Sequence, residues 1–579
     1  MIRLRPLAVI AALIGLTACT TAASGPPADE TAAAPPPAAE PAPPADTSAY
    51  GLFLAGQAAL NHGQGDLAAG YFSQASRTDA DSTFIKGRAF RAALAAGDIP
   101  RAAALAPGPN EGTAAEQLIG RFTVAVEAIA EGKGRAAELE LAGQPLPPPL
   151  DSSARLILPW AAAEAGDWKT ALATPAFGDD RVLAQVAQLD EALIDENRRD
   201  IDKADGVFKS LVADSHGASV YAVAYGEFLQ RHGRTALAIA QYQEVLKAEP
   251  TSELVKMALA RAQAGAPPPR APTPAQGAAG ALIVPAAVLL SEKQPQLGED
   301  FLRLVLRLDP KRDEAWLLLG DAASALGDTD GARAAYAEPQ PGSLVYIGSR
   351  TRLIASYDDI AGSAPTELAL AEETAKGAPD DPEAMELLAD ALRANERYKD
   401  SAAVLDKLIA QLGEKAAWSL YYERGVALDQ AGDWAGAERD LQHALTLSPD
   451  QPEVLNYLGY SWIDRGVQLK AAKAMVEKAV AAKPDDGAIV DSLGWAYYQM
   501  GDYKQAVEQL ERATELEPAD PDINNHLGDA YWRAGRKLEA RFQWQQVLTL
   551  GPSEKLRAEV EAKLRDGLGG PARAAVAER

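Results

Sequence analysis

The sequence predicts an all-α fold, a solenoid of stacked helical hairpins, because three residue types recur in one register. Between Trp418 and Pro552 each type returns every 34 or 35 residues. The recurring residues are glycine at Gly425, Gly459, Gly494 and Gly528, alanine at Ala437, Ala471, Ala506 and Ala540, and proline at Pro449, Pro484, Pro518 and Pro552. A fixed period near 34 is typical of a helix–turn–helix repeat.

The repeat at residues 484–518 shows why these residue types are needed. We expect a first helix at 488–500 that ends at Gly501, because glycine adopts the left-handed conformation at little cost. The second helix, 504–517, ends at Pro518, because proline cannot continue the hydrogen-bond ladder. Apolar residues at helical spacing give each hairpin a stripe that only neighbouring hairpins can bury.

These repeats resemble the tetratricopeptide repeat (TPR). The resemblance implies a right-handed superhelix in which the first helix of each repeat, helix A, lines the inner surface and the second, helix B, lies outside. From Asn456 to Trp544 the chain also resembles the C-terminal half of long bacterial TPR outer-membrane lipoproteins. That class includes the adaptor of a periplasmic carboxyl-terminal processing protease, which delivers peptidoglycan hydrolases to the protease.

The composition of the chain agrees with a helical solenoid. Its 579 residues exceed what one core needs, and the apolar fraction is 47% with only 6% aromatic residues, as in helices rich in Ala and Leu. The net charge of −25 argues against binding to nucleic acid or direct docking on anionic lipid.

The N-terminus has the pattern of an export signal. Arg3 and Arg5 precede an apolar run that is too short for a stable membrane anchor, and Cys19, which follows Leu16-Thr17-Ala18, is the single cysteine of the chain. This resembles the bacterial lipoprotein signal, which implies cleavage after residue 18 and acylation of Cys19. The family's sorting rule, applied to Thr20, implies the outer membrane, with the protein facing the periplasm.

The rest of the chain divides by composition. We expect an Ala/Pro-rich disordered tether at 19–48, a degenerate N-terminal repeat array at 49–265, a Pro-rich break at 266–280, a C-terminal array with a capping helix at 281–567, and a tail at 568–579. The break has three open interpretations. It separates two contiguous sub-arrays that still touch, it is a hinge, or it is a loop that binds a partner.

The resemblance to TPR proteins also indicates which side chains face a partner. In helix A, residues three before and one after the small position held by Gly425, Gly459, Gly494 and Gly528 face inward. To the residues at these offsets we add His526, the neighbour of Asn525, and Trp532, which lies one turn further on. The candidate partner-binding residues are then Asn456, Tyr460, Asp491, Trp495, Asn525, His526, Asp529 and Trp532. Aromatic residues are enriched at binding hot spots, and Asn can hydrogen-bond a peptide backbone. Each aromatic could instead pack on the adjacent repeat.

The same surface argues against some functions. TPR proteins that grip an acidic C-terminus use Lys and Arg here, whereas this chain offers Asn, Asp, Tyr and Trp. The common motifs of nucleophilic, zinc and nucleotide sites do not occur, and the five histidines lack metal-ligand spacing. We therefore expect no enzyme activity, no catalytic residue, no metal, no cofactor and no small-molecule substrate.

Three hypotheses follow for the function. The first is a membrane-anchored, periplasm-facing adaptor that binds other proteins, possible partners being a periplasmic protease and cell-wall hydrolases. The second is an assembly factor for an outer-membrane machine, in secretin or barrel-protein biogenesis. The third is an enzyme domain hidden in the degenerate region 105–212, against which the Ala-rich helical pairs argue.

Overall fold

The computed structural model describes residues 48–61, 65–143, 146–214, 218–358 and 360–569. The expected signal peptide, Cys19 and almost all of the expected tether lie outside these ranges. Within them the regular secondary structure is helical and no strand occurs. The predicted all-α repeat fold is confirmed.

The chain forms two compact units, residues 1–363 (unit 1) and 364–579 (unit 2). The expected Pro-rich break at 266–280 falls inside unit 1 and is shorter than expected, because a helix already begins at Pro274. Proline is well suited to the first helical position, and the side chains of Thr273 and Gln276 each bond the other's backbone N–H. The extended segment therefore ends at Thr273.

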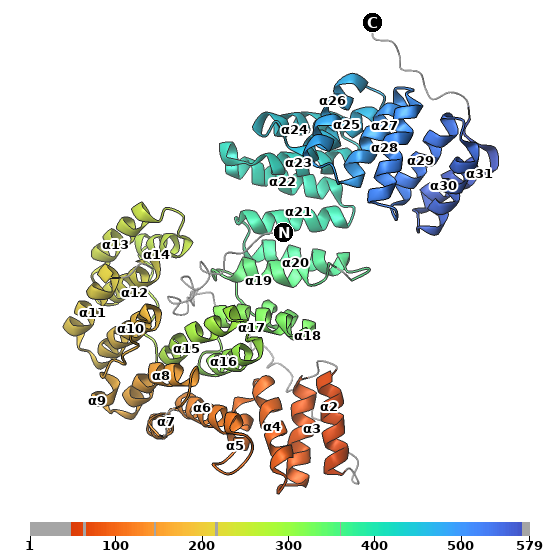
Figure 1. Ribbon diagram of the computed structural model, residues 1–579. Coiled ribbons are helices and arrows are strands. Elements are labelled where there is room, and N and C mark those ends of the chain that lie inside the picture. The colour runs from red at the N-terminus through yellow and green to blue at the C-terminus, as the bar shows by residue number, and fades with distance from the viewer. Residues whose placement is uncertain (1–47, 62–64, 144–145, 215–217, 359, 570–579) are drawn as a thin grey trace, which may run out of the picture. The chain divides into compact units, whose positions relative to one another are not determined.

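Unit 1 contains eighteen described helices (Figure 1). They are α2 (Ala49–Asn61), α3 (Gly65–Thr78), α4 (Thr83–Ala95), α5 (Ile99–Leu105), α6 (Ala114–Ala130), α7 (Gly134–Leu141), α8 (Leu150–Ala165), α9 (Trp168–Ala171), α10 (Arg181–Arg198), α11 (Ile201–Asp214), α12 (Ala218–Arg231), α13 (Thr235–Ala248), α14 (Glu253–Gln263), α15 (Pro274–Ser291), α16 (Pro295–Leu308), α17 (Asp313–Ala325), α18 (Thr329–Ala337) and α19 (Tyr346–Ala355).

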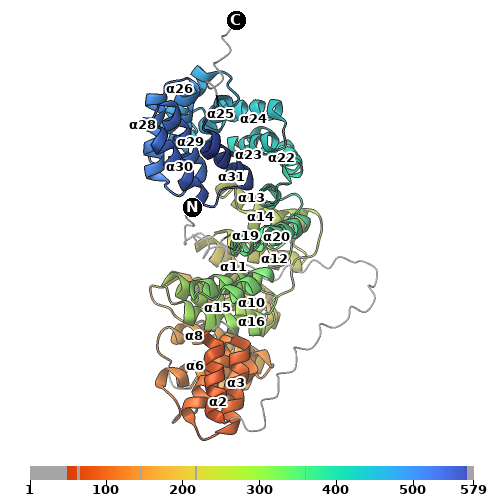
Figure 2. The ribbon, with the colours of Figure 1, turned by 90° about the vertical axis from the view of Figure 1, so that its right-hand side faces the viewer.

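The hairpin α15–α16 does not continue the stack after α14. It packs instead on earlier hairpins of unit 1, so that α15 contacts α8 and α10 while α16 contacts α4 and α6 (Figures 1 and 2). The helices it covers are the first members of successive hairpins, the position of helix A. The inner side of the N-terminal array is therefore filled by a later part of the same chain.

Specific side-chain pairs hold α16 in this place. The rings of Phe122 and Phe301 stack with centroids 5.5 Å apart. Arg307 donates to both carboxylate oxygens of Glu127, at 2.8 and 2.9 Å. On α4, Arg91 pairs with the buried Asp300 at 2.9 Å. Buried charges are tolerated when paired in this way, so these contacts fix the position of the hairpin.

Helix α15 is the core helix of unit 1. By length and apolar composition it could cross a membrane, and it is the single helix of the described ranges that meets this test. Most of its residues are buried inside the protein. A helix that is apolar on all sides needs cover on all sides, and α8, α10 and α16 provide much of it.

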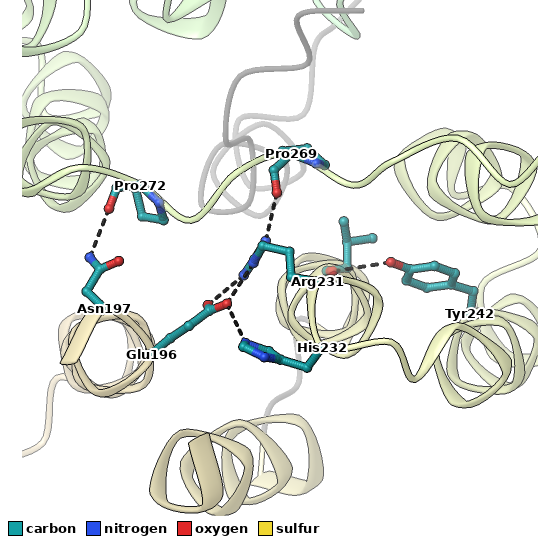
Figure 3. A network of polar contacts seen from close by, with 8 residues as sticks. Glu196, Asn197, Arg231, His232, Tyr242, Pro269 and Pro272 are labelled. Atoms are coloured by element: carbon teal, nitrogen blue, oxygen red, sulfur yellow. Dashed lines mark hydrogen bonds and ion pairs between the residues drawn. The ribbon is translucent and has the colours of Figure 1, made fainter. Parts of the chain in front are cut away.

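The Pro-rich segment that leads into α15 is held by side chains of the hairpins it crosses (Figure 3). Arg231 donates to both carboxylate oxygens of Glu196 at 2.7 Å and to the carbonyl of Pro269 at 3.1 Å. Asn197 donates to the carbonyl of Pro272 at 2.9 Å. The segment therefore works as a strap that carries the chain from α14 back to α8.

Gly277 provides a test of this packing, because it touches the indole of Trp160 on α8. A methyl group at Gly277 would overlap the ring, whereas at Gly280 it would meet only the flexible end of Arg312, 3.7 Å away. We expect Gly277→Ala to destabilise unit 1 by about 1–3 kcal/mol through overpacking. Gly280→Ala, on the same helix, should be neutral or stabilising. Urea unfolding of both variants checks this, and equal stabilities would contradict the docking.

Unit 2 is a regular stack of hairpins. Its helices are α20 (Ala364–Gly377), α21 (Pro382–Ala394), α22 (Tyr398–Leu412), α23 (Trp418–Gln430), α24 (Trp434–Leu447), α25 (Pro452–Asp464), α26 (Leu469–Ala482), α27 (Gly487–Gln499), α28 (Tyr503–Leu516), α29 (Pro521–Arg533), α30 (Lys537–Thr549) and α31 (Glu554–Asp566), with a 3-10 turn at Gly413–Lys415. The two helices expected at 488–500 and 504–517 are α27 and α28, each displaced by one residue.

One expected repeat position is wrong by one residue. Ala437, Ala506 and Ala540 are fully buried, but in α26 the buried residue is Ala472, and Ala471 is exposed. The turn before α26 is one residue longer than its counterparts and contains Gln468 at a φ of 49°. The extra residue of the 35-residue spacing therefore lies in this turn, and the helix that follows is rotated accordingly.

Candidate protein-binding surface

The eight predicted partner-binding residues all lie on α25, α27 and α29, which are the A helices of three successive repeats. Gly459, Gly494 and Gly528 occupy their close-packed positions, where an added methyl group would contact Val476, Leu510 and Trp544 of the following helix. This close approach fixes which side of each A helix faces its own helix B. The predicted residues form one row across the three A helices, the A surface of unit 2.

Asp491, Trp495 and His526 form one cluster. Nδ1 of His526 lies 2.9 Å from a carboxylate oxygen of Asp491, and its ring stacks on Trp495 with centroids 4.1 Å apart. Trp495 stacks in turn on Tyr498 at 4.4 Å. Burial lowers the pKa of His526, but the charge and hydrogen bond of Asp491 outweigh it, so the pKa is raised. The pair therefore contributes stability that is lost as pH rises through the raised pKa.

Asn525 and Asp529 are bound by the chain itself, which corrects the expectation that they face a partner. Lys563 of α31 donates to Asn525 Oδ1 at 2.9 Å and to Asp529 Oδ2 at 2.8 Å. The other Asp529 oxygen accepts from Trp544 at 3.0 Å. Burial raises the pKa of Asp529, and the charge of Lys563 opposes it. This closed network ends the A surface at α31.

Trp532 also packs within the chain. Its ring contacts Gly567, just after α31, and lies 5.3 Å from the ring of Trp544. The ammonium group of Lys537 lies 5.1 Å from the centroid of the Trp532 ring. Trp532 therefore belongs to the contact between α29 and the capping helix.

Asn456, Tyr460 and Trp495 are predicted residues that stay partly exposed on the A surface. All three are half-buried, and Asn456 Oδ1 and Trp495 Nε1 have no hydrogen-bond partner within the described chain. Burial, and then the charge of Asp491, raise the pKa of Tyr460, so its hydroxyl stays protonated. Both of these atoms are themselves buried, so the part of this surface that a partner can contact directly includes the exposed aromatic area of Tyr460 and Trp495.

Acidic residues continue this surface toward α21, and the sequence analysis missed them. Glu386 and Asp390 stand three before and one after Ala389 on α21, and Tyr422 stands three before Gly425 on α23. Burial and the charges of Asp390 and Glu386 raise the pKa of Glu423 to about 7, against the opposing charge of Arg393. The offsets used for the later repeats, applied to α21 and α23, would have found the first three residues.

No group of three or more His, Cys, Asp or Glu side chains with the geometry of a metal site occurs in the described ranges. His526, which lies beside acidic groups, is hydrogen-bonded to Asp491. The side chains of this surface offer a partner hydrogen bonds, aromatic contact area and negative charge.

Comparisons with known proteins identify the repeats. Residues 299–342, 368–417 and 422–487 match a family model described as tetratricopeptide repeat, and residues 494–535 match a second model, described as TPR repeat. A TPR repeat-containing protein of Pseudomonas aeruginosa is 32% identical over 122 residues, and human tetratricopeptide repeat protein 13 is 35% identical over 119 residues. The chain spans about 20% and 13% of the lengths of these relatives.

Solved structures resemble the chain less closely. The Cut9–Hcn1 heterotetramer of the APC/C contains a chain that is 15% identical, with a TM-score of 0.36, over 90% of this chain and 96% of that one. YrrB, described as a TPR protein with an unusual peptide-binding site, is 18% identical with a TM-score of 0.26, over 33% of this chain and 97% of its own.

Proposed function

Since residues 299–342, 368–417, 422–487 and 494–535 are tetratricopeptide repeats, we propose that the chain is a membrane-anchored scaffold that binds partner proteins on the A surface of unit 2. Repeats of this kind generally bind other proteins or peptides. The inner side of the N-terminal array in unit 1 is filled by α15 and α16, and this leaves unit 2 as the better candidate.

The observation that carries the proposal is the set of partly exposed side chains, Asn456, Tyr460 and Trp495, on two successive A helices. Asn456 Oδ1 and Trp495 Nε1 lack partners within the described chain, and a buried polar group without a partner typically costs about 1–3 kcal/mol. Both atoms are buried from solvent, so a bound protein pairs with them when the two side chains turn toward it. Tyr460 and Trp495 add rigid aromatic area at a low cost in conformational entropy.

The finer version of the proposal concerns location and partners. Acylation of Cys19 holds the protein on the outer membrane, facing the periplasm, and residues 20–48 give the folded part reach. The partners are a carboxyl-terminal processing protease and the peptidoglycan hydrolases that the scaffold delivers to it. Binding both at once makes their encounter intramolecular and raises their effective concentration.

Asn456 and Asn525 hold equivalent positions in A helices of the same surface but differ in what they contact, so they give a matched test. We expect Asn456→Ala to weaken partner capture about tenfold with stability changed by less than about 0.5 kcal/mol, because Oδ1 has no internal bond. Asn525→Ala removes an acceptor of Lys563 and should destabilise unit 2. Pull-down from envelope extract with residues 49–579, beside urea unfolding, measures both effects.

Three results separate the hypotheses. Unchanged capture by Asn456→Ala would contradict the assignment of the surface. Recovery of neither a protease nor a wall hydrolase would count against the delivery role. Loss of secretin multimers or barrel proteins from cells that lack the protein would favour the alternative, an assembly factor for an outer-membrane machine.

A further inference from the structure

The first two A helices of unit 1 expose large apolar side chains at the end of the solenoid. Tyr50 and Leu54 on α2 are 68% and 49% exposed, and Phe84 on α4 is 60% exposed. Tyr50 and Leu54 are one helical turn apart and so share a side of α2. The ring of Phe84 lies 5.5 Å from that of Phe53, which brings α4 to the same place. Tyr50, Leu54 and Phe84 form the end patch.

An arginine, Arg88, lies beside the end patch. The guanidinium of Arg88 lies 5.6 Å from the ring centroid of Phe84, and Arg88 has no carboxylate partner among the residues that the structure describes. Of the four basic residues in 49–95, Lys86 pairs with Glu111 and Arg91 pairs with Asp300. The other two basic residues are Arg77 and Arg88, and the same range also carries Asp66, Asp79 and Asp81.

We propose that the end patch rests on the surface of a lipid bilayer, the membrane to which Cys19 attaches the chain. The attachment at Cys19 is part of the proposed function, and 29 residues separate it from Ala49. Tyrosine and phenylalanine with adjacent arginine are typical of the membrane–water interface. The acidic remainder of the protein does not oppose this contact at physiological salt, where charges are screened beyond about 8 Å.

The size of the patch favours a lipid surface over a protein partner. Three exposed side chains are far fewer than the roughly 20–30 residues per side that a stable protein interface typically needs. A membrane contact can be weak, because the acyl group supplies most of the binding and makes the contact of the end patch intramolecular. The contact would orient unit 1 at the membrane and leave its other end directed away from it.

The test replaces the acyl group by an artificial anchor, so its outcome does not depend on whether Cys19 is acylated. Residues 19–579 with Cys19→Ser and an N-terminal His tag are held on vesicles of phosphatidylethanolamine and phosphatidylglycerol that contain a nickel-chelating lipid. Because the chain then has no cysteine, a bimane label enters at Thr83→Cys beside the patch, or at Leu538→Cys in unit 2. Nitroxide-labelled lipids quench bimane that is near the bilayer.

We expect severalfold stronger quenching at residue 83 than at residue 538. The further changes Tyr50→Ser and Phe84→Ser should abolish the difference, whereas Leu447→Ser, at an exposed apolar residue of unit 2, should not. Helix content by circular dichroism verifies that the variants fold. Equal quenching at the two labels, or quenching unaffected by the double change, would overturn the proposal. A bimane shift that depends on protein concentration without vesicles would identify a second copy of the chain as the occupant instead.

Discussion

Lys563→Ala is expected to lower the free energy of unfolding of unit 2 by about 3–5 kcal/mol, the usual effect of removing one member of a buried ion pair. The ammonium group of Lys563 bonds Asn525 and Asp529, and all three residues are at most 7% exposed. Without the ammonium group of Lys563, the carboxylate of Asp529 keeps one hydrogen bond, which Trp544 donates. The positive charge that remains near it is that of His526, which is more distant.

The loss should depend on pH in a defined direction. Burial raises the pKa of Asp529 in the folded protein, and removal of Lys563 would raise it further. A carboxyl whose folded pKa is raised destabilises the protein as pH rises above its unfolded pKa, near about 4. The effect of Lys563→Ala should therefore be larger at about pH 8 than at about pH 5.

Tryptophan fluorescence during urea unfolding measures this effect, because six of the nine tryptophans lie in unit 2. The control is Lys555→Ala, an exposed lysine on the same helix, which should change stability by less than about 0.5 kcal/mol. Lys563→Met keeps most of the apolar stem and isolates the charge. If Lys563→Ala lowers the free energy of unfolding by less than about 1 kcal/mol, the contacts of Lys563 with Asn525 and Asp529 do not hold α31 against the A surface.

The contrast between the two units explains which parts of the fold were predictable. In unit 2 each hairpin packs on its sequence neighbours, so a pattern with a period near 34 carries the structure, and α27 and α28 lie within one residue of their expected ranges. In unit 1 the position of α15 depends on α8, more than 100 residues earlier. Periodicity contains no information on such a contact.

A signal for the return of α15 was nevertheless present in the sequence. Residues 275–290 contain no charged side chain, and a helix that is apolar on every side cannot be the exposed member of a hairpin. Gly277, at which a side chain would overlap Trp160, marks the close approach. The charged pairs Arg91–Asp300 and Glu127–Arg307 could not be predicted, because acidic and basic residues are abundant and only the fold selects partners.

The sequence predicted which helices carry the candidate site. It did not predict which of the side chains there are already bound within the chain. Offsets from the small residue of helix A placed Asn456, Tyr460 and Trp495 on the A helices of successive repeats. The same offsets do not tell which side chains are bound internally. Asp491 binds His526, 35 residues later, and Asp529 binds Lys563, 34 residues later. Both steps equal one repeat, so a search for opposite charges one period apart would have found both pairs.

Asp190→Asn is expected to stabilise unit 1, in contrast to most changes of buried residues. Asp190 lies on α10 at 4% exposure, and its Oδ2 has no hydrogen-bond partner in the described chain. The unpaired hydroxyl of the buried Tyr221 is close enough for the charge of Asp190 to raise its pKa. Burial raises the pKa of Asp190 well above its ordinary value, and the nearby indole of Trp160 opposes the shift only in part. An amide fits the same space without a charge.

The pH dependence gives this prediction its sign. The folded protein keeps a proton on Asp190 that the unfolded chain releases above about pH 4. The stability of unit 1 therefore falls as pH rises from about 4 toward the raised pKa, by at most about 1.4 kcal/mol per pH unit. The amide introduced by Asp190→Asn does not ionise, so the variant loses this slope, and its advantage over the natural chain should grow from about pH 5 to about pH 8.

Hydrogen–deuterium exchange of peptides from α8, α10 and α15 measures the local free energy of opening at each pH. Comparing the two proteins at the same pH removes the intrinsic pH dependence of exchange. Asp179→Asn, an exposed carboxylate in the loop before α10, serves as the control and should leave the profile unchanged. The prediction is wrong if the difference in the free energy of opening between the two proteins stays constant from about pH 5 to about pH 8. Asp190 would then not change its charge on unfolding in this range.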